Sequence, residues 1–250
     1  MLGALHSDTL KTANNLALAL KHQGKLEDAM QLLRHVLEGR ESTLGHRHPE
    51  TLQALNTLAM VLYKQGNLAE AAPLMRRALN DLELAFGTDH PHTMEAVKQL
   101  ALLLQAQGEA EEAAQLFQRA LEGSRERLGP AHPDTLYSTN NMASVLEAQG
   151  RLDEAALMLR HVLEGFESSL GAAHPETLQA IGKLSSILYA QGNLSQAEPL
   201  CRRALEGFEL NLGAAHPRTL TAVNDLAALL EAQCRPDEAA ALRVQFELST

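Results

Sequence analysis

The sequence lacks tryptophan altogether, and aromatic residues make up 3% of its 250 residues. Its two cysteines, Cys201 and Cys234, lie far apart, which fits a reducing compartment and excludes a disulfide framework. No apolar run approaches the ~18 residues of a membrane span. The first residues have neither the basic start nor the apolar core of a secretory signal. These absences predict a cytoplasmic protein that does not enter a membrane.

Basic residues are also scarce relative to acidic ones, and the formal net charge is −10. Because phosphate binding needs clustered Lys and Arg, this balance argues against a nucleic-acid partner. The hydrophobic content of 45% is dominated by Leu and Ala, which are strong helix formers. The composition therefore predicts helices packed on helices rather than a sheet sandwich.

Histidine sets the register of an internal repeat. Six histidines recur at one constant interval, and five of them are followed by Pro-x-Thr, whereas the first repeat has Ser7 in place of the proline. A glycine ladder, a Gln-Gly ladder and an alanine ladder share the same interval. Such agreement between independent ladders establishes the repeat. The six histidines are His6, His48, His90, His132, His174 and His216.

Each repeat is predicted to form two antiparallel helices, which the second repeat illustrates. Residues 48–65 have helical apolar spacing, and Pro49 suits the first turn, where a missing N–H costs nothing. Gly66 then ends this leading helix in a left-handed conformation. A second amphipathic stretch, the trailing helix, runs over about residues 68–84, and Gly87 closes it.

One such pair of helices cannot bury its own apolar face, whereas six stacked pairs form a continuous core. The sequence therefore predicts an all-α solenoid. We expect one domain over residues 1–250, with repeats at about 3–44, 45–86, 87–128, 129–170, 171–212 and 213–250.

Several of these phrases resemble a known family. The Gln-Gly turn, the small residue at Ala29 and the Arg-Arg-Ala-Leu of residues 76–79 and 202–205 resemble tetratricopeptide repeats. The phrases Leu-Gly-x-x-His-Pro-x-Thr-Leu and Asn-Asn-x-Ala…Gln-Gly (residues 140–150) resemble the 42-residue variety of kinesin light chains and nephrocystin. The resemblance covers essentially the whole chain. It implies a right-handed α-solenoid of six helix-turn-helix units that works as a protein-interaction scaffold or adaptor.

The pattern predicts neither an enzyme nor a metal or other cofactor. The repeated histidines occur once per repeat, and packed helices lie roughly 8–10 Å apart, too far for ligands ~2 Å from one zinc ion. We expect these histidines to cap the following helices or to bond to neighbours. Cys201 occupies a core position and Cys234 a turn-glycine position, so neither is a candidate nucleophile.

In this family the leading helices line a concave groove, and one row on that face is rich in asparagine. Asparagine is a mediocre helix former, so its recurrence in mid-helix calls for a reason. Its amide both donates and accepts, which suits an extended peptide backbone; the alternative is bonding across neighbouring helices. The row is Asn14, Asn56, Lys98, Asn140, Gly182 and Asn224.

The next row on this face is apolar in the first three repeats and small in the last three: Leu18, Met60, Leu102, Ser144, Ser186 and Ala228. Lysines flank the early part, and Glu147, Asp225 and Glu231 flank the late part. The three tyrosines also map here, although packing inside a curved solenoid is an alternative reason for the apolar residues. The predicted peptide-binding residues are Lys11, Asn14, Leu18, Asn56, Met60, Tyr63, Lys98, Leu102, Tyr137, Asn140, Tyr189 and Asn224.

Together these rows predict that repeats one to three bind a peptide with an apolar or aromatic anchor next to acidic residues. Such a ligand resembles the tryptophan-plus-acidic cargo motif of kinesin light chains. Two alternatives stay open at this point. The chain could be a structural segment that self-associates end to end, or a regulatory domain of a larger signalling protein.

Overall fold

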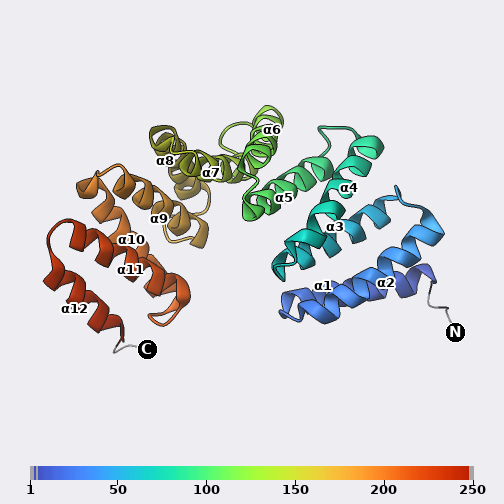
Figure 1. Cartoon of the computed structure of the whole chain (residues 1–250), viewed down its shortest axis with the longest axis horizontal. Coiled ribbons are helices and arrows are strands. Elements are labelled where there is room, and N and C mark those ends of the chain that lie inside the picture. Colours follow the sequence, from blue (N-terminus) through green and yellow to red (C-terminus); the bar gives the residue numbers. More distant parts are fainter. Residues whose placement is uncertain (1–2, 4, 248–250) are drawn as a thin grey trace. The chain divides into compact units, whose positions relative to one another are not determined.

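The computed structural model describes residue 3 and residues 5–247, and within these residues the chain forms α-helices and no strands (Figure 1). The all-α repeat solenoid predicted from the sequence is confirmed. The leading helices are α1 (Ser7–His22), α3 (Pro49–Lys64), α5 (Pro91–Gln107), α7 (Pro133–Ala148), α9 (Pro175–Ala190) and α11 (Pro217–Ala232). The trailing helices are α2 (Leu26–Leu44), α4 (Leu68–Phe86), α6 (Ala110–Leu128), α8 (Leu152–Ser169), α10 (Leu194–Leu212) and α12 (Pro236–Glu247).

The chain divides into two compact units, which we call unit 1 (residues 1–123) and unit 2 (residues 124–250). In unit 1 each helix from α1 to α5 packs against the next along the chain, and in unit 2 the helices from α7 to α12 do the same. In both units neighbouring leading helices also touch directly, α3 against α5 and α9 against α11. A single domain over residues 1–250 stays a prediction.

Every leading helix begins with the same histidine cap. The imidazole Nδ1 atom accepts a hydrogen bond from the backbone N–H two residues later, at 3.2–3.3 Å in all six repeats. A cap of this kind satisfies one of the helix's unpaired N–H groups. In several repeats the threonine hydroxyl also donates to the glycine carbonyl six residues earlier, as Thr177 does to Gly171 at 2.8 Å. The predicted capping role of the histidines is confirmed.

The turn between the two helices of a repeat needs a left-handed residue. Gly66 and its counterparts have φ values between 74° and 83°, as predicted for a residue that ends a helix. In the last repeat Cys234 occupies this position with φ 62°, the one non-glycine residue with positive φ among the described residues. A Cβ atom is strained in this conformation, so the backbone here is less stable than in the other repeats.

Replacing Cys234 with glycine is therefore expected to raise the free energy of unfolding by about 0.5–1 kcal/mol. Relief of the Cβ strain outweighs the greater freedom of glycine in the unfolded chain. Urea denaturation followed by circular dichroism measures the change. Cys234→Ala is the control, because it removes the thiol and keeps the Cβ; an equal gain in both variants would contradict the backbone explanation.

In several repeats a glutamine side chain bonds to the repeat before it. The Gln107 and Gln233 amides donate to the backbone carbonyl oxygens of Leu68 and Leu194, and the Gln191 amide donates to Asp153 at 2.7 Å. Each of these bonds reaches the start of the preceding trailing helix. The glutamine that precedes the turn residue is therefore part of the contact between neighbouring repeats.

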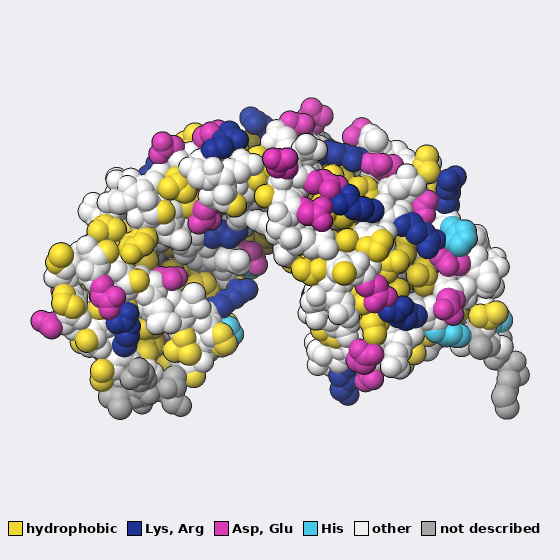
Figure 2. Space-filling view, in the orientation of Figure 1, with side chains coloured by type: hydrophobic (Ala, Val, Ile, Leu, Met, Phe, Trp, Pro, Cys, Tyr) yellow, Lys and Arg dark blue, Asp and Glu magenta, His cyan; other side chains and the backbone are white. Residues whose placement is uncertain are grey.

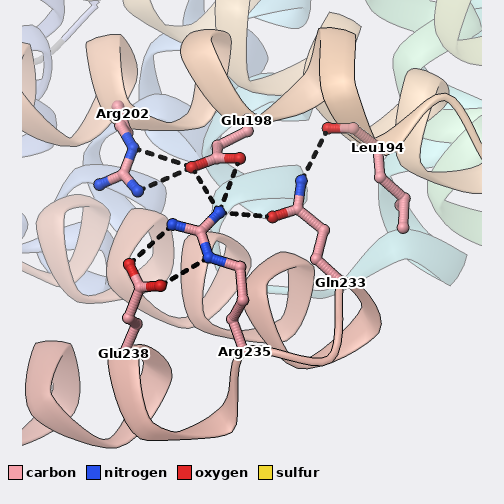
Figure 3. A network of polar contacts seen from close by, with 6 residues as sticks. All are labelled: Leu194, Glu198, Arg202, Gln233, Arg235 and Glu238. Atoms are coloured by element: carbon pink, nitrogen blue, oxygen red, sulfur yellow. Dashed lines mark hydrogen bonds and ion pairs between the residues drawn. The ribbon is translucent and has the colours of Figure 1, made fainter.

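At the junction between the last two repeats, a charged network lies beside the hydrogen bond from Gln233 to Leu194 (Figure 3). Glu198 of α10 accepts hydrogen bonds from Arg202 at 2.7 Å and from Arg235 at 2.9 Å. Arg235 also binds Glu238 and the side-chain oxygen of Gln233. The pKa of Glu198 is lowered to about 2. The largest cause is the hydrogen bond from Arg202, and the hydrogen bond from Arg235 lowers the pKa further. The network fastens the α11–α12 hairpin to α10.

Candidate functional site

The predicted binding residues of unit 1 lie on one side of its leading helices, and most remain accessible. Lys11 is exposed, and the other accessible positions are half-buried. Figure 2 shows apolar side chains (yellow) interspersed with charged ones on the visible face of each unit. The half-buried residues are Leu18, Asn56, Met60, Tyr63, Lys98 and Leu102.

Two residues of α1 differ from the faces that sequence spacing assigned to them. Asn14, expected on the open side, is 5% exposed. Leu16 lies three residues after Ala13 and four before Leu20, which is the apolar spacing of the packed side, yet it is 51% exposed. The counterparts Leu58 and Leu100, at 2% each, lie on helices that pack against a preceding trailing helix. No such helix precedes α1 among the described residues, which explains the exposure of Leu16.

The asparagine row lies deeper than the row beside it. The Oδ1 atoms of Asn14, Asn56 and Asn140 are buried and have no hydrogen-bond partner in the described part of the chain. Bonding of these oxygens across neighbouring helices, the structural alternative, is therefore not seen. A buried acceptor without a partner costs about 1–3 kcal/mol.

Lys98 is paired within its own helix. Its ammonium group lies 2.6 Å from the Glu95 carboxylate, and half of the Glu95 side chain is exposed. An ion pair this accessible to water contributes little to stability. Lys98 can therefore exchange this partner for the carboxylate of a ligand at low cost.

In unit 2 the predicted residues differ in environment. Asn140 is buried, Asn224 is exposed and the Tyr189 side chain is 43% exposed. Tyr137 packs on the core formed by Leu136, Val162, Phe166 and Ala180, and its ring centroid lies 5.1 Å from that of Phe166. Burial, then the nearby Glu176 and Asp134, raises the pKa of Tyr137.

Unit 2 also contains a pocket that sequence reasoning did not find. It has a volume of about 520 Å³ and lies where α9 and α11 face each other over α10. Gly182 lines it at the position where four other repeats carry asparagine. This glycine in the asparagine row was the one sign of the pocket in the sequence. Small side chains at Ser186 and Ala228 widen the opening, and Tyr189 stands beside it.

The floor of the pocket contains a cysteine. The thiol of Cys201 lies 2.8 Å from the hydroxyl of Ser185, which also donates to the Ala197 carbonyl oxygen. Burial raises the pKa of Cys201, so the group stays a neutral thiol at physiological pH. The expectation that Cys201 lies in the core is confirmed, because the residue is 7% exposed.

Three charged residues line the pocket: Lys183, Arg218 and Asp225. Lys183 turns its ammonium group to the hydroxyl of Ser144 on α7, 2.8 Å away, and burial lowers its pKa. Asp225 of α11 stays open to solvent at the rim, and partial burial of its carboxyl group raises its pKa. It has no hydrogen-bond or ion-pair partner in the described residues, but Arg218 of the same helix also lines the pocket, so charges of both signs border it.

The described residues contain neither a metal-binding cluster nor a membrane-spanning helix. No group of three or more His, Cys, Asp or Glu residues in the described ranges has the geometry to hold a metal ion. Among the same residues, every helix is too short or too polar to cross a membrane. The site is therefore described by its helix faces and its pocket.

Helical hairpins that recur at a constant interval, with a shared cap and turn, define the chain as a helical repeat protein. The family model for the tetratricopeptide repeat matches residues 8–84, 53–126, 93–168 and 176–242, so the chain belongs to the tetratricopeptide repeat family. Its repeats are of kinesin light chain type. A comparison with curated protein sequences gave no significant match.

Solved structures show the same fold. The chain is similar to BtubC (BKLC) from P. vanneervenii, with a TM-score of 0.75 and 20% identity, over 89% of each chain. It is also similar to the nearly identical TPR-like repeats of a putative kinesin light chain from Podosopora anserina, with a TM-score of 0.70 and 25% identity, over 83% of this chain and 98% of that one. The apo form of RapI matches with a TM-score of 0.72 and 16% identity, over 90% and 84% of the two chains.

Proposed function

We propose that the protein is a non-enzymatic scaffold that binds an extended segment of a partner protein along the leading helices of unit 1. Tetratricopeptide repeats generally mediate protein–protein interaction. The observation that carries the proposal is that α3 presents half-buried Asn56, Met60 and Tyr63 on one face, so that an amide and two apolar side chains are partly accessible together. Such a surface offers polar and apolar contacts together.

The chemistry of this surface specifies the ligand. The half-buried amide of Asn56 would hydrogen-bond to the backbone of the bound segment, and an apolar or aromatic side chain would rest on Met60 and Leu102. An acidic residue beside this anchor would replace Glu95 as the partner of Lys98. This ligand is an extended peptide with an apolar anchor and adjacent acidic residues, as in kinesin light chain cargo recognition.

The test uses a fluorescent peptide that carries one tryptophan flanked by glutamates. We expect the double variant Asn56→Ala/Lys98→Ala to weaken its binding at least ~10-fold, because truncating contact residues of this kind costs more than about 1 kcal/mol. Fluorescence anisotropy measures the affinity, and circular dichroism checks that helicity is unchanged. Lys25→Ala/Asn67→Ala is the matched control, since both residues are exposed and lie between helices, away from this face. Equal affinity of the two double variants would contradict the proposal.

Self-association, a regulatory role in a larger protein and a cytoplasmic location stay predictions.

A further inference from the structure

The pocket of unit 2 surrounds a helix position that has no side chain. Gly182 lies in the middle of α9, and apart from its own helix backbone and adjacent residues no atom lies within 4 Å of the place where its Cβ would be. Packing therefore does not require a glycine here, although glycine makes a helix interior less stable than alanine would. The small side chains of Ser186 and Ala228 also line the pocket. Unit 2 thus keeps open space where a larger side chain would stabilise its helix.

The walls of this space are mainly apolar, and they suit an aromatic ring. Phe208 of α10 and Tyr189 of α9 contribute rings, and the thiol of Cys201 at the floor behaves as a small apolar group. A volume of about 520 Å³ lies within the ~300–1,000 Å³ typical of ligand-binding pockets. Because aromatic rings pack favourably on other rings, edge to face or offset, the interior favours an aromatic side chain.

Two charged side chains at the border of the pocket lack partners. Arg218 and Asp225 both lie on α11 and are exposed, and their side chains have no hydrogen-bond or ion-pair partner among the described residues. Lys183, the third charged residue of the lining, already has a partner, because its ammonium group lies 2.8 Å from the Ser144 hydroxyl. The pocket therefore presents one free charge of each sign, and a guest with a single charge would pair with only one of them.

The spacing of these two charges matches alternate side chains of an extended segment. Arg218 and Asp225 lie seven residues apart on one face of α11, which corresponds to ~10 Å along the helix axis. Thr221 and Ala222 line the pocket between them. In an extended chain the first, third and fifth side chains point to one side and span ~13 Å, a difference that the long arginine side chain can bridge. An acidic, an aromatic and a basic residue at alternate positions therefore match Arg218, the open space above Gly182 and Asp225, in that order.

We propose that this pocket is a second docking site, which takes the aromatic side chain of an extended protein segment whose flanking acidic and basic residues pair with Arg218 and Asp225. The inference rests on the proposed function, because it assigns the pocket to protein recognition. It concerns another unit and a ligand that needs a basic residue, which the surface of unit 1 does not require. The two sites can therefore fail separately.

The probe is a capped pentapeptide with glutamate, phenylalanine and lysine at alternate positions, separated by alanines. Isothermal titration calorimetry with the full chain should detect its binding. Replacing the phenylalanine of the peptide with alanine should weaken binding at least ~10-fold, because a buried aromatic anchor contributes most of the contact energy. Replacing the glutamate or the lysine with glutamine should weaken it about 2–5-fold each, as for ion pairs that water can reach. No binding of the probe, or equal binding of the alanine peptide, would overturn the proposal.

Variants of the chain then assign each charged pair. In Arg218→Gln the glutamate of the peptide should no longer matter, whereas its lysine should keep its effect, and Asp225→Asn should give the converse result. Arg160→Gln and Asp237→Asn are the matched controls, because they remove the same charges from exposed positions on α8 and α12, and both effects should persist in them. Identical peptide preferences in all four variants would refute the pairing.

Two substitutions at one position test whether the anchor enters the open space. Gly182→Leu fills this space with a branched side chain and should weaken binding of the probe at least ~10-fold, since it excludes the anchor. Gly182→Ala adds only the Cβ and should retain binding. Both variants should keep or raise the urea midpoint, because each replaces a glycine in a helix interior. Equal binding by the two variants would place the anchor elsewhere and overturn the proposal.

Two further measurements separate this site from its alternatives. Asn56→Ala/Lys98→Ala should leave binding of the probe unchanged, and Gly182→Leu should leave binding of the tryptophan–glutamate peptide unchanged, since the two sites belong to different units. A loss in either case would indicate one shared site and refute the second. N-acetyl-phenylalanine amide should bind at least ~10-fold more weakly than the probe, because it lacks the flanking residues. Equal affinity would identify a small-molecule site and overturn the assignment to a protein segment.

Discussion

Replacing Phe166 with alanine is expected to lower the free energy of unfolding by about 3–5 kcal/mol. The Phe166 side chain is fully buried and packs with Leu136 of α7, Val162 of α8 and Ala180 of α9. It therefore joins the helices of two successive repeats. Its removal would leave a cavity that the surrounding helices cannot fully close, and Tyr137 would lose the ring against which it packs.

Urea denaturation followed by far-UV circular dichroism measures this loss. Leu210→Ala is the matched control, because Leu210 is a large apolar residue of the same unit and is 82% exposed. Its effect should stay within about ±0.5 kcal/mol, as for other surface positions. Comparable losses in the two variants would contradict the assignment of Phe166 to the core.

Replacing Glu198 with glutamine is expected to lower the free energy of unfolding by about 1–2 kcal/mol at neutral pH, because a charge-assisted hydrogen bond that water can partly reach is worth roughly this much. Near pH 2 the replacement should have no effect. Glutamine keeps the shape of the side chain but cannot pair as a charge with Arg202 and Arg235 (Figure 3).

The pH dependence follows from the direction of the pKa shift. The pKa of Glu198 falls from 4.5 to about 2 in the folded chain, so the carboxylate stabilises the fold fully above pH 4.5. This contribution is lost as the pH falls from 4.5 towards 2, where glutamate and glutamine become equivalent. Urea midpoints of both proteins across this range would show two curves that converge in acid. Glu206→Gln, an exposed residue of the same helix, is the control, and parallel curves for Glu198→Gln would refute the linkage.

The fold could be predicted from the sequence because the residues that begin, end and pack the helices recur at fixed positions of each repeat. Histidine before proline, glycine after glutamine and alanine at a fixed distance each require a particular backbone or packing environment, and they recur in one phase. The structure places α3 and α4 within two residues of their predicted bounds. Even the departure at Cys234 keeps the left-handed conformation of the glycines that it replaces.

The candidate site was less predictable, because burial on a helix depends on its neighbours. Sequence spacing assigned Leu16 to the packed side, but its exposure depends on a helix that would have to precede α1. Tyr137 was predicted on the same face as Tyr189, but the Tyr137 ring packs against Phe166 of the core. The pocket needs side chains from α9, α10 and α11 together, and no period within one repeat indicates such a combination.

The pocket straddles a repeat boundary, and this has a consequence for how such a chain can change by copying its own segments. Gly182 and Phe208 belong to the fifth repeat, whereas Ala222 and Asp225 belong to the sixth. Duplication of either repeat alone would lengthen the array without transmitting the pocket, because each copy would carry half of its walls. Duplication of the fifth and sixth repeats together would copy the whole pocket. The unit that can be inherited with the pocket intact is therefore the pair of repeats and not the single repeat.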